Sequence, residues 1–237
     1  MAKKRMQLIA MFSVIVFLRF LFIFIMGPMP QDAYYFFYSQ HLALSYFDHP
    51  PMIAYMLRLF SAILGNNVIA IKVADSFVTF LTIVFFSNLA SCFLGPRQLK
   101  KAMLLLISTL LVTIMSLVST PDAPLLLFWT LSLYFLYQAI FRRTSVYWLW
   151  SGIAMGLAFD SKYTAVFLPA GLILFLILSK PYRHYLLSKW FWLAVVSFFV
   201  IVSPVVIWNA GHNFASFKFQ STSRMGPFSG IHLQIKY

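Results

Sequence analysis

Glutamate is absent from this chain of 237 residues, and aspartate occurs only five times. Charged residues make up 10% of the sequence and hydrophobic residues 62%. A soluble globular domain carries about a quarter of charged residues, so this balance excludes that class of protein. The single cysteine, Cys92, lies inside an apolar run, so the chain has neither an internal disulfide framework nor a cysteine-based metal site.

Lysine and arginine outnumber the acids and give a net charge of +13. A nucleic-acid-binding protein would gather these residues on one soluble face. Here they fall in short clusters between apolar runs, so we expect no nucleic acid partner and interpret them as topology determinants in contact with membrane lipids. No cofactor is evident from the sequence, and a divalent metal requirement is not readable from it.

Seven apolar runs have about the length that a membrane-spanning helix needs, and each ends at glycine, proline or charge. They cover residues 7–26, 68–94, 102–119, 124–141, 146–160, 163–179 and 190–208. The first run follows a basic start without a small-residue cleavage site, so we interpret it as an uncleaved span. The predicted fold class is an all-α polytopic transmembrane bundle.

Basic clusters occupy every second connection between these runs. Their members are Lys3, Lys4, Arg5, Arg97, Lys100, Lys101, Arg142, Arg143, Lys180, Arg183 and Lys189. The positive-inside rule places these connections and the amino terminus in the cytoplasm. Residues 27–67, 120–123, 160–163 and 209–237 then face the opposite side. Within 27–67 the many aromatic residues predict one or two short helices at the outer interface, the second after Pro50 and Pro51.

The aspartates follow this topology. Four of them are predicted on the outer side: Asp32, Asp48, Asp122 and Asp160. Asp75, in the second span, lies one helical turn after Lys72 and is expected to form a local ion pair with it. Outer carboxylates can act as a general base toward an acceptor hydroxyl or amine, while His49 and Lys162 can hold a phosphate. This combination suits a phosphorylated lipid substrate.

Each of these residues also has a purely structural interpretation. Asp122 after proline fits a helix N-cap, and Asp32 can cap an interfacial helix that begins at Ala33. The 48–49 pair before two prolines can form a plain turn, and Lys162 can snorkel at the end of a short span. A transporter or flippase-like protein that binds an anionic lipid without chemistry is the functional alternative, although transporters place ionisable residues nearer the midplane.

Five motifs occur in order along the chain. They are Asp-Ala-Tyr-Tyr from residue 32, Tyr-Phe-Asp-His-Pro-Pro-Met from 46, Thr-Pro-Asp-Ala-Pro-Leu from 120, Ser-Lys-Tyr-Thr-Ala from 161 and Ile-Trp-Asn-Ala-Gly-His-Asn-Phe-Ala-Ser-Phe from 207. Together they resemble the GT-C-fold bacterial glycosyltransferases related to dolichyl-phosphate-mannose protein mannosyltransferase and the lipid A aminoarabinose transferase. We interpret residues 1–222 as one transmembrane domain of this type, followed by a divergent tail, 223–237.

The resemblance implies a bacterial inner-membrane enzyme that takes a sugar from a polyprenyl-phosphate donor. It would place the sugar, with inversion, on a lipid, glycan or protein acceptor at the periplasmic face. The resemblance assigns catalytic roles to two acids, Asp32 and Asp122. It assigns substrate binding to Asp48, His49, Lys162, Tyr163 and Tyr35.

Three features depart from the family pattern. The family commonly shows Asp-Glu where this chain has Gln31 and Asp32, so either Asp32 takes over the role of the base or the base is lost. His49 stands where a Lys-Pro-Pro element contacts the donor phosphate, and because imidazole is charged only when protonated, donor binding should weaken as the pH rises. Relatives usually carry further spans and a soluble domain, so an inactive truncated remnant is a further alternative.

Overall fold

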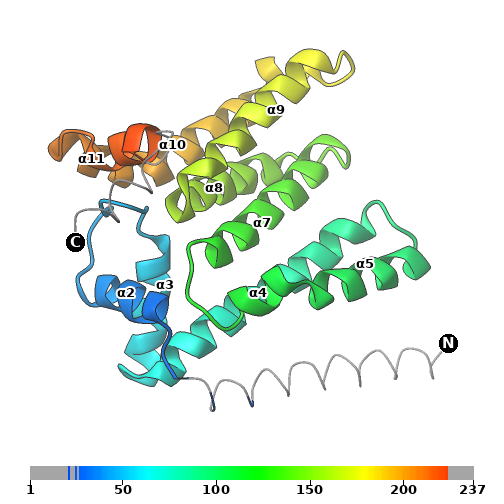
Figure 1. The fold of residues 1–237 in the computed structure, drawn as a ribbon. Coiled ribbons are helices and arrows are strands. Elements are labelled where there is room, and N and C mark those ends of the chain that lie inside the picture. Colours follow the sequence, from blue (N-terminus) through cyan, green and yellow to red (C-terminus); the bar gives the residue numbers. More distant parts are fainter. Residues whose placement is uncertain (1–20, 22–24, 26, 224–237) are drawn as a thin grey trace. The chain divides into compact units, whose positions relative to one another are not determined.

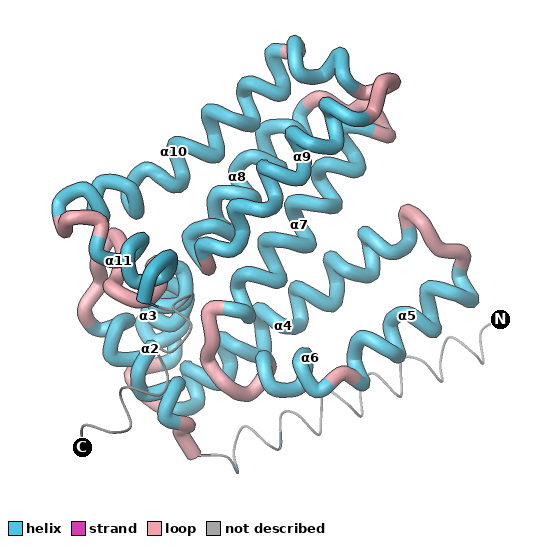
Figure 2. Tube along the Cα trace, turned by 45° about the horizontal axis from the view of Figure 1, so that its top comes forward, coloured by secondary structure: helices cyan, strands magenta, loops and turns pink. Residues whose placement is uncertain are grey.

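The computed structural model describes residues 21, 25 and 27–223. Within residues 27–223 the chain forms ten α-helices and no strand (Figures 1 and 2). The helices are α2 (Pro30–Gln40), α3 (Met52–Leu64), α4 (Val68–Ser91), α5 (Pro96–Ser108), α6 (Leu110–Met115), α7 (Asp122–Ile140), α8 (Val146–Ser161), α9 (Phe167–Leu178), α10 (Lys189–Gly211) and α11 (Ala215–Lys218). Three short helical turns complete the chain: η1 (Tyr163–Val166), η2 (Arg183–Leu187) and η3 (Phe219–Ser223). The predicted all-α class is confirmed.

The chain divides into two compact units, which we describe separately. The first contains residues up to 41 and 53–123, and the second contains 42–52 and the residues from 124 onward. The expected first span, 7–26, and the expected tail, 223–237, lie almost wholly outside the described residues. Both therefore stay predictions.

Two short helices, α2 and α3, form in the segment expected to hold one or two of them. α3 begins at Met52, directly after Pro50 and Pro51, because a residue before proline is disfavoured in the helical region. α2 begins at Pro30 and not at Ala33, so that hypothesis is wrong by three residues. The reason is that proline suits the first turn of a helix, where its missing N–H has no partner to lose.

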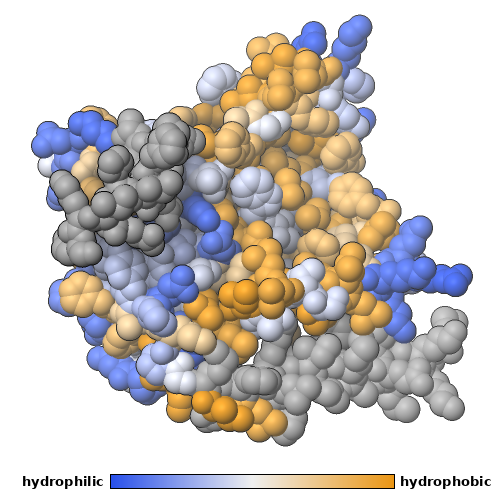
Figure 3. Space-filling view, viewed as in Figure 1, coloured by the Kyte–Doolittle hydropathy of each residue, from blue (hydrophilic) through white to orange (hydrophobic). Residues whose placement is uncertain are grey.

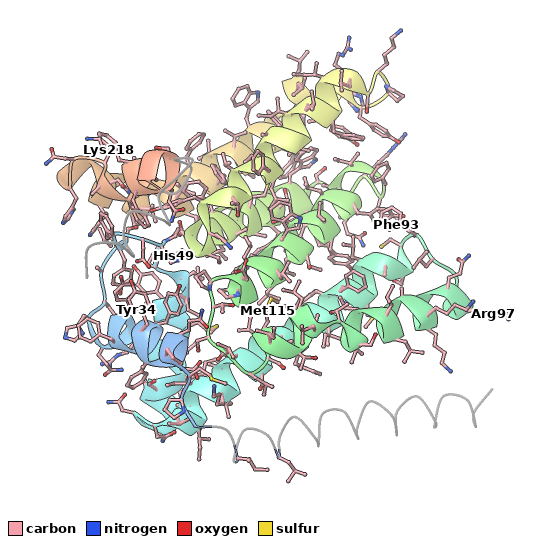
Figure 4. All side chains as sticks on the ribbon, in the orientation of Figure 1. Tyr34, His49, Phe93, Arg97, Met115 and Lys218 are labelled. Carbon is pink, nitrogen blue, oxygen red and sulfur yellow. The ribbon has the colours of Figure 1, made fainter. Side chains whose placement is uncertain are left out.

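In the first unit, α4 and α5 are neighbours in sequence joined by a short turn. Figure 4 labels Phe93 in this turn and Arg97 at the start of α5. The side chain of Asn67 caps α4 by accepting a 2.9 Å hydrogen bond from the backbone N–H of Ala70. Buried apolar side chains from α4, α5 and α6 pack together: Ile83, Met103, Ile107 and Val112. These contacts form a small core of the first unit.

Residues 102–119 do not form the single span that their hydropathy predicts. The helix stops at Ser108, Thr109 adopts an extended backbone (φ −70°, ψ 139°), and α6 restarts for only six residues. The Thr109 hydroxyl donates to the carbonyl of Leu106 at 2.7 Å and accepts from the N–H of Val112 at 3.4 Å. A threonine that bonds to nearby backbone offers the chain an alternative to helix. Residues 116–121 after α6 are not α-helical.

In the second unit, α7, α8, α9 and α10 run beside one another around an apolar core (Figures 1 and 2). Its most buried members include Ala139, Trp148, Ala158, Leu176 and Ala194. α8 and α10 approach most closely at two glycines of α8. A Cβ added to Gly152 would lie 2.2 Å from the carbonyl oxygen of Ala194, and one added to Gly156 would lie 2.7 Å from the Cβ of Ile201. This small-xxx-small spacing lets helix backbones come together in a membrane.

Three helices in the described part of the chain are long and apolar enough to cross a membrane: α4, α7 and α10. They correspond to three of the predicted spans. α8 and the η1–α9 segment, Tyr163–Leu178, coincide with two further predicted spans but are shorter. Figure 3 shows many apolar side chains on α4 to α9, with hydrophilic ones at the α4–α5 and α9–α10 connections and also over α2 and α11.

Candidate functional site

Four buried polar side chains join three segments of the first unit. Asp32 lies in the first turn of α2, Lys72 and Asp75 lie in α4, and Ser119 lies in the loop before α7. All four have an exposed fraction of 0%. We call them the buried ionic cluster. Charges without solvent contact are tolerated only when they pair with each other and are hydrogen-bonded.

The carboxylate of Asp32 accepts from three donors on three segments. Oδ2 accepts from the backbone N–H of Met29 at 2.7 Å and from the ammonium group of Lys72. Oδ1 accepts from the backbone N–H of Ser119 at 2.8 Å. Lys72 also donates to the carbonyl oxygen of Leu117. Asp32 is therefore a capping residue of α2 and the centre of a tertiary network at the same time.

Asp75 does not pair with Lys72, so the predicted local ion pair on α4 is wrong. The Lys72 side chain reaches the start of α2, and Oδ2 of Asp75 accepts a 2.7 Å hydrogen bond from the Ser119 hydroxyl. Ser119 thus serves two carboxylates, Asp32 through its N–H and Asp75 through its hydroxyl. Oδ1 of Asp75 is buried without a hydrogen-bond partner in the described part of the chain.

The structure places the other two candidates of this unit differently. Tyr35 is buried, with its ring edge-on to Tyr34 at 5.2 Å, whereas Tyr34 is exposed and its hydroxyl lies 2.7 Å from that of Tyr38 (Figure 4). Asp122 is the first residue of α7 and is partly exposed. A carboxylate in the first turn of a helix is stabilised by the helix dipole. The cap interpretation of Asp122 stays a prediction.

A second group of candidates lies in the second unit, where three segments meet. His49 Nε2 lies 3.8 Å from Asp48 Oδ2, and both side chains are largely buried. The side-chain amide of Gln220 donates to the carbonyl oxygen of Asp48. The rings of Phe47 and Phe219 pack at 4.8 Å. These contacts attach the segment 42–52 to the residues after α10. Figure 4 labels one residue of each segment, His49 and Lys218.

Tyr163 links the segment 42–52 to the residues after α10 through its hydroxyl group. Its hydroxyl lies 2.8 Å from Ser216 Oγ and 3.3 Å from Ser45 Oγ, and both serines are fully buried. Asn209 stabilises the turn that presents Ser216, because its side chain bonds to the carbonyl of Val205 at 3.0 Å and accepts from the N–H of Phe217 at 3.3 Å. We call Ser45, Tyr163 and Ser216 the hydroxyl bridge.

Lys162 is the residue between α8 and η1. It is partly exposed, with an extended backbone (φ −159°, ψ 134°), and its N–H donates to the carbonyl of Ala158 at 3.0 Å. Asp160, two residues earlier, is buried, and its Oδ1 has no hydrogen-bond partner within residues 27–223. No group of three or more His, Cys, Asp and Glu side chains that would suit a metal ion occurs among the residues described.

The comparisons with known proteins agree with this architecture. Residues 48–208 match the family of dolichyl-phosphate-mannose-protein mannosyltransferases, and the chain belongs to this family. It is 28% identical over 184 residues to the lipid A galacturonosyltransferase RgtD of Rhizobium johnstonii, a match covering 77% of this chain and 38% of that protein. It is 26% identical over 189 residues to the lipopolysaccharide core galacturonosyltransferase RgtA of the same species, covering 77% and 37%. The chain thus spans less than two fifths of these relatives, and no solved structure matches it significantly.

Sequence reasoning missed several residues that hold the candidates in place. They are Lys72 and Ser119 around Asp32, and Ser45, Asn209, Ser216 and Gln220 around the second group. Ser216 and Asn209 lie within a motif that carried the resemblance, which was the available signal. For Ser45 and Ser119 no signal exists, because a serine beside an apolar run has no distinctive spacing.

Proposed function

We propose that this chain serves a membrane glycosyltransferase that moves a sugar from a polyprenyl-phosphate donor to an acceptor at the periplasmic face, with inversion. One observation carries the proposal: three segments distant in sequence converge on Asp48 and His49. Hydrogen bonds from Gln220 and the hydroxyl bridge of Tyr163 hold the loop that presents them. Membership of a mannosyltransferase family named for a lipid-phosphate donor supports the donor class.

The chemistry fits the residue types of this group. A protonated His49 and the Lys162 ammonium supply positive charge for the oxygens of a donor phosphate. The Asp48 carboxylate, 3.8 Å from the imidazole, can serve as the counter-ion of a protonated His49. The resemblance assigns Tyr163 and Tyr35 to substrate contact. The ring of Tyr163 packs against Phe159 and Phe217, and Tyr35 belongs to the aromatic group of α2.

The transfer is a single displacement. The oxygen of an acceptor hydroxyl forms a bond to the anomeric carbon while the bond from that carbon to the phosphate oxygen breaks. The electron pair leaves with the phosphate, so polyprenyl phosphate is the second product. The hydroxyl proton passes to a carboxylate, the role that the resemblance gives to Asp32 and Asp122. Attack opposite the leaving group inverts the configuration.

The acceptor class is suggested by the relatives. RgtD and RgtA are named for galacturonosyl transfer to lipid A and to the lipopolysaccharide core. A saccharolipid acceptor and a galacturonosyl donor are therefore the first substrates to test. Lipid, glycan and protein acceptors of other kinds follow if these fail.

The test uses the full chain in proteoliposomes with polyprenyl-phosphate-linked, radiolabelled galacturonic acid and lipid A. We expect His49→Ala to reduce transfer by about 100-fold, as removal of one preorganised donor does at other sites. His49→Lys should retain transfer and lose much of the decline that the wild type shows as the pH is raised, because lysine stays charged. His184→Ala is the matched control, since His184 is exposed between α9 and α10.

Wild-type rates in His49→Ala would contradict the role of His49 in binding the donor. Donor binding by the wild type without any transfer would instead favour the transporter or flippase-like alternative. Transfer with retained anomeric configuration would contradict the single displacement.

A further inference from the structure

We propose that Lys72 is a positioning residue, acting through Asp32, and that Asp122 is the acid that meets the acceptor. This inference rests on the proposed function, because it concerns the base of the transfer. It deepens that function by choosing between the two acids. The juxtaposition that carries it is the contact of Lys72 and Asp32 with the segment directly before Asp122.

Both carboxylate oxygens of Asp32 are engaged in the structure. An ionised carboxylate offers about four lone-pair sites, and donors from three segments already occupy three of them. Its exposed fraction is 0%. A general base must bring its oxygen within about 3.2 Å of the heavy atom whose proton it abstracts, or act through one water. An acceptor on a lipid would reach Asp32 only after the network had opened.

The hydrogen bonds of the buried ionic cluster reach the segment that precedes Asp122. Between Ser116 and Ser119 the backbone is bonded at three points by α4 and α2. The hydroxyl of Ser76 donates to the carbonyl of Ser116 at 2.9 Å, Lys72 donates to the carbonyl of Leu117, and the N–H of Ser119 donates to Asp32. These groups lack helical partners because residues 116–121 are not α-helical. Irregular backbone in a membrane protein is tolerated where other protein groups satisfy it in this way.

Asp122 follows the tethered segment by three residues and begins α7. The Asp122 residue is partly exposed, whereas Asp32 is fully buried. Loss of the Lys72 charge would leave Asp32 buried without its counter-ion and the carbonyl of Leu117 without its donor. The segment would then shift, and Asp122 with it. Lys72 therefore controls the position of Asp122 without contacting the substrate.

The experiment compares Lys72→Met with the double variant Lys72→Met/Asp32→Asn. Breaking a buried ion pair on one side is strongly destabilising, whereas removing both charges is often nearly neutral. We expect Lys72→Met to lower the Tm in detergent by at least about 6 °C and transfer by about 100-fold. The double variant should recover most of the Tm and most of the transfer rate. The asparagine oxygen can still accept from the N–H of Ser119.

A labelling measurement separates position from stability. In a Cys92→Ser background, Thr120→Cys reports the tethered segment through its rate of reaction with a maleimide below the Tm of every variant. We expect this rate to change in Lys72→Met and to return in the double variant. Thr79→Val is the matched control on the same face of α4: its buried hydroxyl has no hydrogen-bond partner in the described part of the chain, so all three readouts should stay at wild-type values.

The double variant is decisive, because it should fold even where Lys72→Met does not. If its Tm recovers but transfer stays absent, Asp32 is the base and the inference is overturned. An unchanged labelling rate in Lys72→Met would overturn the positioning role. If the wild type transfers no sugar, the proposed function fails, and with it the role of Asp122. The Tm and labelling results then still decide whether Lys72 holds the segment through Asp32.

Discussion

At the scale of single residues, the five aspartates occupy five different environments. Asp32 has three donors, one of which is its counter-ion Lys72, and within the described residues Asp75 is hydrogen-bonded through one oxygen only. Asp48 lies beside an imidazole, Asp122 starts a helix, and Asp160 is buried with one oxygen lacking a hydrogen-bond partner among the residues described. The same side chain is thus a structural anion in one place and a candidate acid in another. Exposure and partners distinguish these roles, and residue type does not.

Asp122→Asn tests the candidate base at this scale. A general base contributes about 10²- to 10⁴-fold to rate, so transfer should fall by at least about 100-fold. Stability should change little, since loss of a charge at a helix start costs about 0.3 to 1 kcal/mol. Transfer and thermal unfolding are measured on the same preparation.

Asp160→Asn is the isosteric control for that experiment. Asp160 is buried and has no assigned role, so the amide should leave the transfer rate unchanged. If Asp122→Asn keeps the wild-type rate, or if its loss of activity follows an equal loss of folded protein, the cap interpretation of Asp122 is correct.

At the scale of elements, the close contact of α8 with α10 depends on two glycines, which have no side chain to keep the helices apart. Gly152 faces the Ser197 hydroxyl and the carbonyl of Ala194, where no Cβ fits. The α5–α6 break has the opposite origin. There the hydroxyl of Thr109 and the partners of residues 116–119 stabilise a backbone that hydropathy alone would have made helical.

Gly152→Ala should destabilise the second unit. The added methyl group would lie 2.1 Å from Ser197 Oγ and 2.2 Å from the carbonyl oxygen of Ala194, so α8 and α10 must separate. Overpacking of this kind costs about 1–3 kcal/mol. Thermal unfolding in detergent measures the effect.

Gly171→Ala in α9 is the matched control, since no atom lies within 4 Å of its added Cβ. It should raise stability by up to about 1 kcal/mol through the better helix propensity of alanine. Equal effects of the two substitutions would contradict the close approach of α8 and α10.

At the scale of the whole molecule, the alternation of basic clusters predicts one orientation in the membrane. Asn66, between α3 and α4, should face the periplasm, and Thr144, between α7 and α8, the cytoplasm. Both are exposed. In a Cys92→Ser background, an impermeant maleimide should label Asn66→Cys in cells with a permeable outer membrane. Thr144→Cys should react only after the inner membrane is opened, and the reverse pattern would invert the proposed face of action.

Much of the fold was predictable from the sequence, because it depends on local chemistry. Apolar runs at 68–94, 124–141 and 190–208 form the three longest of the described helices, and the prolines before Met52 set the start of α3. The motifs placed the family correctly. The prediction of a single span over 102–119 was wrong, because hydropathy does not detect hydroxyl groups that bond to the backbone and interrupt the helix.

The candidate site was predictable only as a set of residues. Polar groups at the ends of apolar runs are costly near a membrane, so the sequence singled out Asp32, Asp48, His49 and Tyr163. Their partners did not stand out, since Lys72 lies 40 residues from Asp32 and Ser45 lies 118 residues from Tyr163. Spacing along one helix favoured Asp75 as the partner of Lys72, and that expectation was wrong.

The sequence by itself determined the class of this protein: a helical membrane chain whose acids are predicted at one face. Composition and hydropathy suffice for that, because a residue prefers lipid or water whatever its neighbours are. Only the tertiary structure decided which carboxylate is paired. A buried charge takes its partner from whichever segment folds against it, and Lys72 found Asp32 on α2 instead of Asp75 on its own helix.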